Sequence, residues 1–294
     1  MAHPASASLL VWGARAAWAA AAVACGPVLA AALDGRSPAV RSVASVGLWA
    51  AWAAVLCASL ILHPIGLTAL RLATPALVVA VGASAVAGSS DVSAASVAVA
   101  LVVAVASAMV AFAPETGGEF VNGPAYPNER RFLLRAPGPL LLGPLPLSWA
   151  TSVGLPAAGA LLLAARQWVL GAVVTVVGVA AAVVLVRSMH GLSRRWVVFV
   201  PAGVVLHDPM TLADPVLFLR EELVSLAPAA TDTNALDLTA KAFGLALELQ
   251  VASPAQLPLV HAGSHMATMV DATALLFTPT RPGAVLARVR ATRR

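Results

Sequence analysis

Charged side chains are scarce in this sequence, and none falls at the centre of its long apolar runs. Only 11% of the 294 residues are charged and 60% are hydrophobic, whereas soluble proteins average about 25% charged and about 45–50% apolar residues. Ion- and proton-coupled transporters normally carry carboxylates inside the membrane or interrupt their helices there. The absence of charge from the centres of the expected spans therefore argues against a transporter of that kind.

The signatures of common enzymes are also missing. The sequence contains no Walker motif, no GxSxG, no CxxC and no dinucleotide-binding fingerprint. Cys25 and Cys57 lie in apolar runs, where we expect small buried hydrophobic side chains rather than a disulfide. His261 and His265 are four residues apart, but they stand in a Gly-containing loop without the acidic partner of a zinc motif. We therefore expect no catalytic residue, no metal and no cofactor.

Excess positive charge is confined to the apolar part of the chain. Residues 1–195 contain 11 Arg and 5 acidic residues, whereas residues 196–294 contain 7 basic and 8 acidic residues. A nucleic-acid-binding protein carries its basic surface on the folded domain, so we expect no nucleic-acid partner. Arginines beside apolar runs follow instead from the bias of membrane insertion. The single lysine, Lys241, against 17 Arg indicates a GC-rich genome such as that of an actinobacterium.

Six stretches are apolar and long enough for a helix to cross the ~30 Å hydrocarbon core of a bilayer. They are residues 16–33, 42–62, 72–87, 92–113, 146–165 and 168–186, and the third is short unless it begins near Ile65. Only Arg166 and Gln167 separate the last two, which predicts a tight helical hairpin. We expect residues 1–192 to form a six-helix transmembrane domain, in which an uncleaved first helix is favoured over a signal peptide.

The arginines of the short loops predict the orientation of the chain. With a cytoplasmic N-terminus, eight arginines lie inside and three, Arg36, Arg41 and Arg166, lie outside. The inside set is Arg15, Arg71, Arg130, Arg131, Arg135, Arg187, Arg194 and Arg195. We therefore expect a multi-pass protein of the bacterial plasma membrane with both termini in the cytoplasm.

One long loop, residues 114–146, separates the fourth and fifth spans. Its first part carries the densest group of polar side chains in the apolar half: Glu115, Glu119, Asn122, Tyr126, Asn128, Glu129, Arg130 and Arg131. An enzyme could place its acids and phosphate-binding arginines on such a loop. The spacing matches no catalytic signature, so contact between the arginines and anionic lipid headgroups is the simpler interpretation.

The second part of this loop, residues 136–147, is apolar but rich in proline. Its prolines prevent a regular helix, and its apolarity prevents a freely solvated loop. We expect it to lie in the membrane interface or to dip between helices, where protein can shield its backbone. The arginines expected to contact lipid headgroups are Arg135, Arg187, Arg194 and Arg195.

After Arg195 the hydrophobic period changes from helical to alternating. Short strands are expected at residues 196–200, 203–208, 216–219, 223–226, 235–239, 245–251, 256–261 and 273–278. Asp208 precedes Pro209, and we expect its side chain to cap a turn. Pro282, followed by apolar residues at helical spacing, predicts a short C-terminal helix. Residues 193–294 are thus expected to form a small cytoplasmic β domain.

The pattern RRWVVFVPAGVVLHD, followed by an apolar strand and REELVSLAPA, resembles the opening of bacterial pleckstrin-homology-like domains. The closing segment LLFTPTRPGAVLARVRA is similar to the final strand and helix of that family. The resemblance covers about residues 193–294 and implies a partly open β-barrel, capped by one helix and attached to membrane spans. It implies no catalytic residues. The family's phosphoinositide-binding basic loop is not evident, because the first turn, residues 201–203, contains no Lys or Arg.

Three functions remain open, and the first is favoured. A non-enzymatic membrane protein could hold its β domain at the bilayer through a short tether, residues 187–195, and use it to bind a protein partner or assemble an envelope complex. A transporter or lipid-handling protein could line a path with residues 136–147. An enzyme could act on a lipid-linked substrate through residues 115–135. A polar cavity under residues 115–147 would favour the last two, and an apolar groove on the β domain would favour partner binding.

Overall fold

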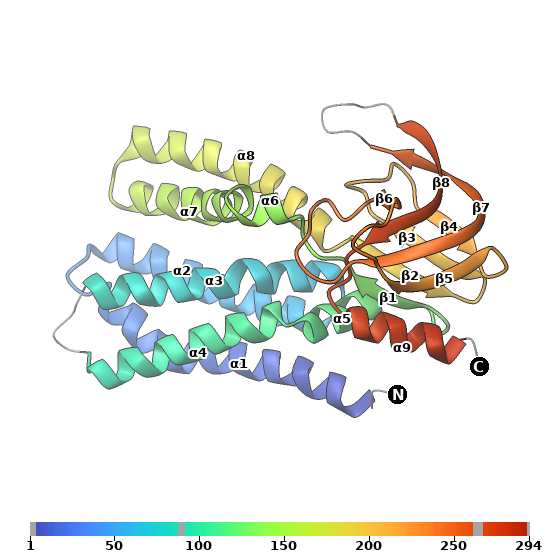
Figure 1. Ribbon diagram of the computed structural model, residues 1–294. Coiled ribbons are helices and arrows are strands. Elements are labelled where there is room, and N and C mark those ends of the chain that lie inside the picture. The colour runs from blue at the N-terminus through green and yellow to red at the C-terminus, as the bar shows by residue number, and fades with distance from the viewer. Residues whose placement is uncertain (1–3, 88–91, 261–266, 293–294) are drawn as a thin grey trace. The chain divides into compact units, whose positions relative to one another are not determined.

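The structure, a computed structural model, describes residues 4–87, 92–260 and 267–292. The chain divides into two compact units (Figure 1). The first comprises residues 1–123 and 147–190, and the second comprises residues 124–146 and 191–294. In the second half of the chain the division falls between His190 and Gly191. Residues 124–146, which we assigned to the transmembrane domain, instead belong to the second unit.

Six long helices are present in the described chain, and each is long and apolar enough to cross a membrane. They are α1 (Pro4–Ala31), α2 (Pro38–Leu60), α3 (Pro64–Ala87), α4 (Ala94–Phe112), α7 (Pro144–Ala164) and α8 (Trp168–Leu192). The six expected spans are thereby confirmed as long apolar helices, and their length and composition are those of a multi-pass membrane protein. The third reaches full length because it begins at Pro64.

The α7–α8 connection is as short as the sequence predicts. Arg166 adopts a left-handed conformation with φ of 62°. The backbone N–H groups of Arg166 and Gln167 donate to the carbonyls of Leu163 (3.0 Å) and Leu162 (2.9 Å). These bonds satisfy the last carbonyls of α7, as in other left-handed helix ends. The chain therefore reverses direction immediately.

Glycines bring α7 and α8 close together. A Cβ on Gly159 would collide with Thr175, and a Cβ on Gly178 would lie 2.8 Å from the Cβ of Leu155. Within lipid, helices associate through such close backbone contacts because burial of apolar surface provides no driving force there. The hairpin is consequently sensitive to any side chain added at these positions.

Helices α1, α3 and α4 pack against one another through small side chains. Their shared core contains Ala21, Cys25, Val28, Val81, Ala100 and Ala104. Both cysteines are free thiols: Cys25 is buried as expected, but Cys57 is exposed on α2. The expectation of burial was wrong for Cys57, because α2 presents most of its surface outward.

Polar side chains fasten α1 to α2. Trp18 donates from Nε1 to the carbonyl of Trp52, and Trp52 donates from Nε1 to the carbonyl of Trp18, both at 3.0 Å. Arg15 donates to the carbonyls of Ser59 and Leu60, also at 3.0 Å. These carbonyls belong to the last turn of α2, where no intrahelical donor is available.

The second unit contains two four-stranded sheets in its described residues. The first has the order β1 (Arg130–Leu133), β2 (Trp196–Val200), β3 (Gly203–His207), β4 (Val216–Leu219). The second has the order β5 (Leu223–Pro228), β7 (Leu247–Leu259), β8 (Thr268–Phe277), β6 (Leu236–Asp237). Neighbouring strands are antiparallel except β6 and β8, which are parallel.

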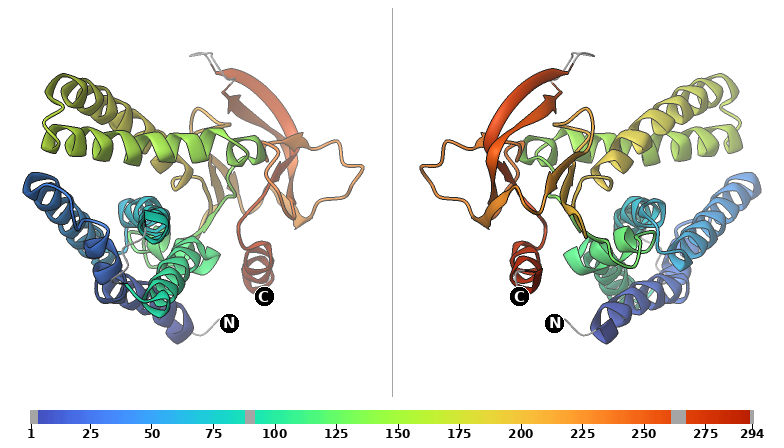
Figure 2. Two further views of the ribbon diagram at one scale, coloured as in Figure 1. Left: turned by 90° about the vertical axis from the view of Figure 1, so that its left-hand side faces the viewer. Right: turned by 90° about the vertical axis from the view of Figure 1, so that its right-hand side faces the viewer.

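One hydrophobic core joins both sheets and the C-terminal helix α9 (Pro282–Thr292). It includes Phe132, Val197, Leu206, Leu247, Phe277 and Val285. In both views of Figure 2, α9 lies at one end of the strands. The short helix α6 (Gly138–Leu141) completes the unit.

Strand β1 was not expected from the sequence. The backbone N–H of Leu134 donates to Arg195 (2.9 Å), and that of Arg135 donates to Thr278 (2.8 Å). The carbonyl of Leu133 accepts from the N–H of Thr280 (2.8 Å). These bonds join residues 133–135 to the start of β2 and to the segment that follows β8. Part of the long loop therefore belongs to the β domain.

Two further strands differ from expectation. The expected strands 245–251 and 256–261 form one continuous strand, β7, which bulges between Gln250 and Ala255 where its register with β8 shifts. The expected strand 235–239 is reduced to the two residues of β6. A bulge keeps a strand paired on both sides of an irregularity, and the sequence alone gave no sign of it.

Candidate functional site

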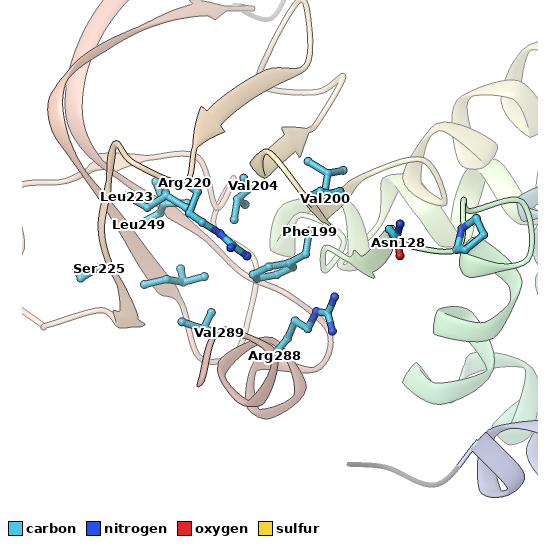
Figure 3. Close-up of a pocket in the computed structure, with 14 residues that line it drawn as sticks. Asn128, Phe199, Val200, Val204, Arg220, Leu223, Ser225, Leu249, Arg288 and Val289 are labelled. Carbon is cyan, nitrogen blue, oxygen red and sulfur yellow. The ribbon is translucent and has the colours of Figure 1, made fainter. Parts of the chain in front are cut away.

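A cavity of about 780 Å³ opens in the second unit beside strand β5, the β2–β3 hairpin and helix α9 (Figure 3). Polar and apolar atoms contribute nearly equally to its surface, and the apolar part is formed by Phe199, Val200, Val204, Leu223, Leu226, Leu249 and Val289. Pro127 and Asn128, which precede β1, also line it. Its volume falls within the ~300–1,000 Å³ typical of ligand pockets. The cavity is therefore the candidate binding site of this unit.

Two arginines supply the charge of this cavity. Arg220 lies in the turn between β4 and β5, Arg288 lies on α9, and both are exposed. Figure 3 shows their guanidinium groups on either side of Phe199. The described lining contains no Asp or Glu. A cleft lined by charge of one sign attracts ions of the other sign, so the site favours an anionic group.

The local backbone fixes the position of Arg220. Its N–H donates to the carbonyl of Ala202 (2.9 Å). Glu222 folds back, and its Oε2 accepts from the N–H of Leu219 (3.1 Å). A Cβ on Gly203 would collide with the carbonyl of Phe218, so only glycine allows this approach of β3 to β4. Helix α9 is held by fully buried Val285, which places Arg288 on the next turn.

The expected polar group of the long loop is divided between the two units. Glu115, Glu119 and Asn122 lie on helix α5 (Pro114–Asn122) of the first unit. Asn122 donates from Nδ2 to the carbonyl of Gly118 (2.7 Å). The remaining members, Tyr126, Asn128, Glu129, Arg130 and Arg131, belong to the second unit. Tyr126 is 79% exposed, and of the whole group Asn128 lines the cavity.

Glu129 and Arg131 take part in a polar cluster outside the cavity. Glu129 accepts from Arg131 Nε (2.8 Å) and from the N–H of Tyr126 (3.1 Å). The bond from Arg131 holds the pKa of Glu129 below its ordinary value. Arg131 also lies over the ring of Trp196, which stacks on His207. These contacts give both side chains a structural role.

His207 is the titratable end of that stack. Burial lowers the pKa of His207, and the positive charge of Arg194 adds to the effect. Its buried Nε2 has no hydrogen-bond partner among the described residues. The imidazole is therefore favoured in its neutral form.

The four arginines expected at lipid headgroups differ in exposure. Arg135, Arg187 and Arg194 are exposed. Arg195 is 1% exposed and forms two bonds with Asp208, from Nε to Oδ1 (2.6 Å) and from Nη2 to Oδ2 (2.7 Å). The expectation of a headgroup contact was wrong for Arg195, because its charge is neutralised inside the protein.

Asp208 caps its turn as predicted. Its Oδ1 accepts from the N–H of Met210 at 3.1 Å. The same carboxylate therefore serves the turn and the buried arginine.

Residues 136–146 of the Pro-rich segment belong to the second unit. The N–H of Gly138 donates to the carbonyl of Lys241 (3.2 Å), so α6 packs on the β6–β7 loop of its own unit. A second cavity, about 540 Å³, lies in the first unit and is lined by residues 32–40 and 158–165, with Arg36 as its charged member. Residues 136–147 do not line it.

The arginines of the cavity escaped sequence analysis. Arg220 follows a strand in the ordinary turn sequence REE, and Arg288 stands on a helix with Arg290 nearby. The residues next to each arginine in the sequence are those of an ordinary solvent-exposed turn or helix. Arg220 lies in a turn and Arg288 on a helix, 68 residues apart in the sequence, so only the fold shows that they share a cavity.

Among the described residues, no group of three or more His, Cys, Asp or Glu could hold a metal ion. His261 and His265 lie outside the described residues. No protein-family model matches the chain, and no curated protein or solved structure is significantly similar to it. The cavity and its two arginines are thus the features from which a function can be argued.

Proposed function

We propose that this protein is a multi-pass protein of the bacterial plasma membrane whose cytoplasmic β domain binds an acidic segment of a protein partner. The cavity beside Phe199 is the binding site. The observation that carries this proposal is its lining, in which an apolar surface is combined with Arg220 and Arg288 and with no acidic residue among those described. The arginine bias of the short loops supports cytoplasmic termini.

The lining fits a peptide in which a carboxylate stands beside an apolar side chain. The planar guanidinium group offers paired N–H donors that match the two oxygens of a carboxylate. Val200, Leu223 and Leu226 are partly exposed and offer apolar contact, and burial of apolar surface drives most protein association. Strand β5 borders the cavity and is an edge strand of its described sheet, a position at which extended peptides can pair.

The domain is proposed to be pleckstrin-homology-like. Two four-stranded sheets around one core, closed by α9, support that assignment. The basic residues of its cavity come from the β4–β5 turn and from α9, and not from the β2–β3 turn at residues 201–202. This placement favours a ligand that reaches between sheet and helix.

Photo-crosslinking in native membranes tests the proposal. A photoreactive amino acid at Ser225, which lines the cavity, should crosslink the full-length protein to a partner. Charge reversal by Arg220→Glu or Arg288→Glu should weaken this binding, by about ten- to hundredfold for each, since a hydrogen bond to a charged group contributes about 1.5–3 kcal/mol. Higher salt should weaken it as well, because both arginines are exposed.

The matched control is Arg290→Glu, which reverses a charge on the same helix outside the cavity lining. It should leave the crosslink intact. Replacing Asp by Asn and Glu by Gln in the crosslinked segment of the partner should weaken crosslinking to the same extent as the charge reversals. A crosslink that survives both charge reversals, or that is equally weakened by Arg290→Glu, would refute the proposed site.

A further inference from the structure

A group of exposed apolar side chains lies on two segments of the second unit, away from its core. Leu141 ends α6 and Leu142 follows it, and they are 43% and 81% exposed. Phe243 and Leu245 in the β6–β7 loop are 59% and 48% exposed. We call these four residues the apolar rim. Single exposed apolar residues are common, but large apolar side chains gathered on adjoining segments mark an interaction surface.

The two segments of the apolar rim are held side by side. The N–H of Gly138 donates to the carbonyl of Lys241 at 3.2 Å. A Cβ on Gly138 would lie 3.2 Å from the ring of Phe243, and a Cβ on Gly244 would lie 3.0 Å from Nε of Arg135. The segments therefore contact each other at two points.

The backbone of the β6–β7 loop is fixed in an uncommon shape. Ala240 and Lys241 have φ of 51° and 57°, a left-handed conformation that L-residues rarely adopt. The N–H of Lys241 donates to Thr239 Oγ1 (3.2 Å), and that of Ala242 donates to the Thr239 carbonyl (3.1 Å). Such conformations persist where the surroundings determine them, so Phe243 is presented on a fixed loop.

Chain connectivity brings the apolar rim to the bilayer. Helix α7, which is long and apolar enough to span a membrane, begins at Pro144. Leu142 is two residues earlier, and two residues extend over at most about 7 Å. Leu142 therefore stays at the membrane boundary, and the β6–β7 loop packed on the same segment stays near it.

We propose that the apolar rim docks the β domain on the membrane surface. Leu142 and Phe243 enter the boundary between headgroups and acyl chains, the depth at which peripheral apolar side chains insert. Arg135 and Lys241 are exposed on the same two segments and contact anionic headgroups. The partner of this surface is an anionic bilayer, and the proposal does not depend on the cavity beside Phe199.

Fluorescence of site-specific labels tests this docking in the full chain. Cys25 and Cys57 are replaced by Ala, and an environment-sensitive dye is attached at Phe243→Cys or, for comparison, at Glu221→Cys. Glu221 is exposed in the β4–β5 turn of the same unit. The proteins are reconstituted into vesicles of phosphatidylcholine and phosphatidylglycerol that contain brominated lipids, which quench dyes at the acyl-chain boundary.

The label at position 243 should be blue-shifted and lose most of its fluorescence to the brominated lipids, and the label at 221 should not. Lys241→Gln should lower the ratio of docked to undocked protein about fivefold on these anionic vesicles. Absence of quenching at 243, or equal quenching at 243 and 221, overturns the proposal. A failure of crosslinking at Ser225 would refute the proposed binding site without changing the fluorescence at positions 243 and 221. The two experiments therefore test the two proposals independently.

Discussion

Replacing Asp208 with Asn should strongly destabilise the β domain. The side chains of Arg195 and Asp208 are 1% and 0% exposed, and Asn would leave the guanidinium charge buried without a counter-charge. Arg195 keeps one further bond, from Nη1 to the carbonyl of Arg135 (2.8 Å), which is neutral and cannot replace the carboxylate. Removing one partner of a buried ion pair costs about 3–5 kcal/mol.

A second ion pair in the same unit provides the control. Glu129 and Arg131 are 14% and 16% exposed at their side chains, and water can reach this pair. Glu129→Gln should therefore cost about 1 kcal/mol or less. Replacing both buried partners, by Arg195→Met with Asp208→Leu, should restore part of the loss, because no charge is then left unpaired although the Arg135 carbonyl and the Met210 N–H lose their bonds to these side chains.

Hydrogen exchange of the full-length protein in lipid nanodiscs measures these differences. Peptides from β2 and β3 should exchange about two to four orders of magnitude faster in Asp208→Asn, which corresponds to about 3–5 kcal/mol. Peptides from α7 and α8 serve as an internal reference. A change below about tenfold, or one equal to that of Glu129→Gln, would show that the pair is not the determinant we infer.

Two further predictions concern packing and pH. Gly159→Val should destabilise the α7–α8 hairpin by about 1–3 kcal/mol, because its side chain would meet Thr175. Thermal unfolding in detergent should show no such loss for Gly154→Val on the same helix, where a Cβ meets nothing within 4 Å; equal losses would contradict the packing argument. Burial keeps the pKa of His207 below 6.5 in the folded protein, so the unfolded chain takes up the proton first and stability should fall as the pH drops below about 6.5. His207→Phe should lose this component while keeping the stack on Trp196, and an unchanged slope of stability between about pH 7.5 and about pH 5.5 would contradict it.

The helices were predictable because each apolar run determines its own structure. About 20 apolar residues satisfy their backbone only as a helix in lipid, whatever lies elsewhere in the chain. The α7–α8 hairpin followed from two intervening residues, Arg166 and Gln167. Strands such as β2 and β4 were predictable from alternation over four or five residues.

Features that depend on distant partners were not predictable. Strand β1 has the local sequence RRFL within a polar loop, and it is a strand because it pairs with β2. Arg195 resembles its exposed neighbour Arg194 in sequence, and only Asp208 on the facing strand end makes it a buried residue. The arginines of the cavity come from separate elements, a turn and a helix, so no spacing rule connects them.

The contribution of β1 makes the β domain discontinuous along the chain. Phe132 and Leu134 belong to its core, yet two membrane-length helices separate them from β2. During synthesis β1 is made before α7 and α8, and its partner β2 is made after them. The two strands can therefore pair only once both helices have been synthesised. A fragment that begins at residue 193 would expose the free edge of β2 and lack two core side chains, so a soluble form of the domain requires residues 124–143 joined to it by a linker in place of the hairpin.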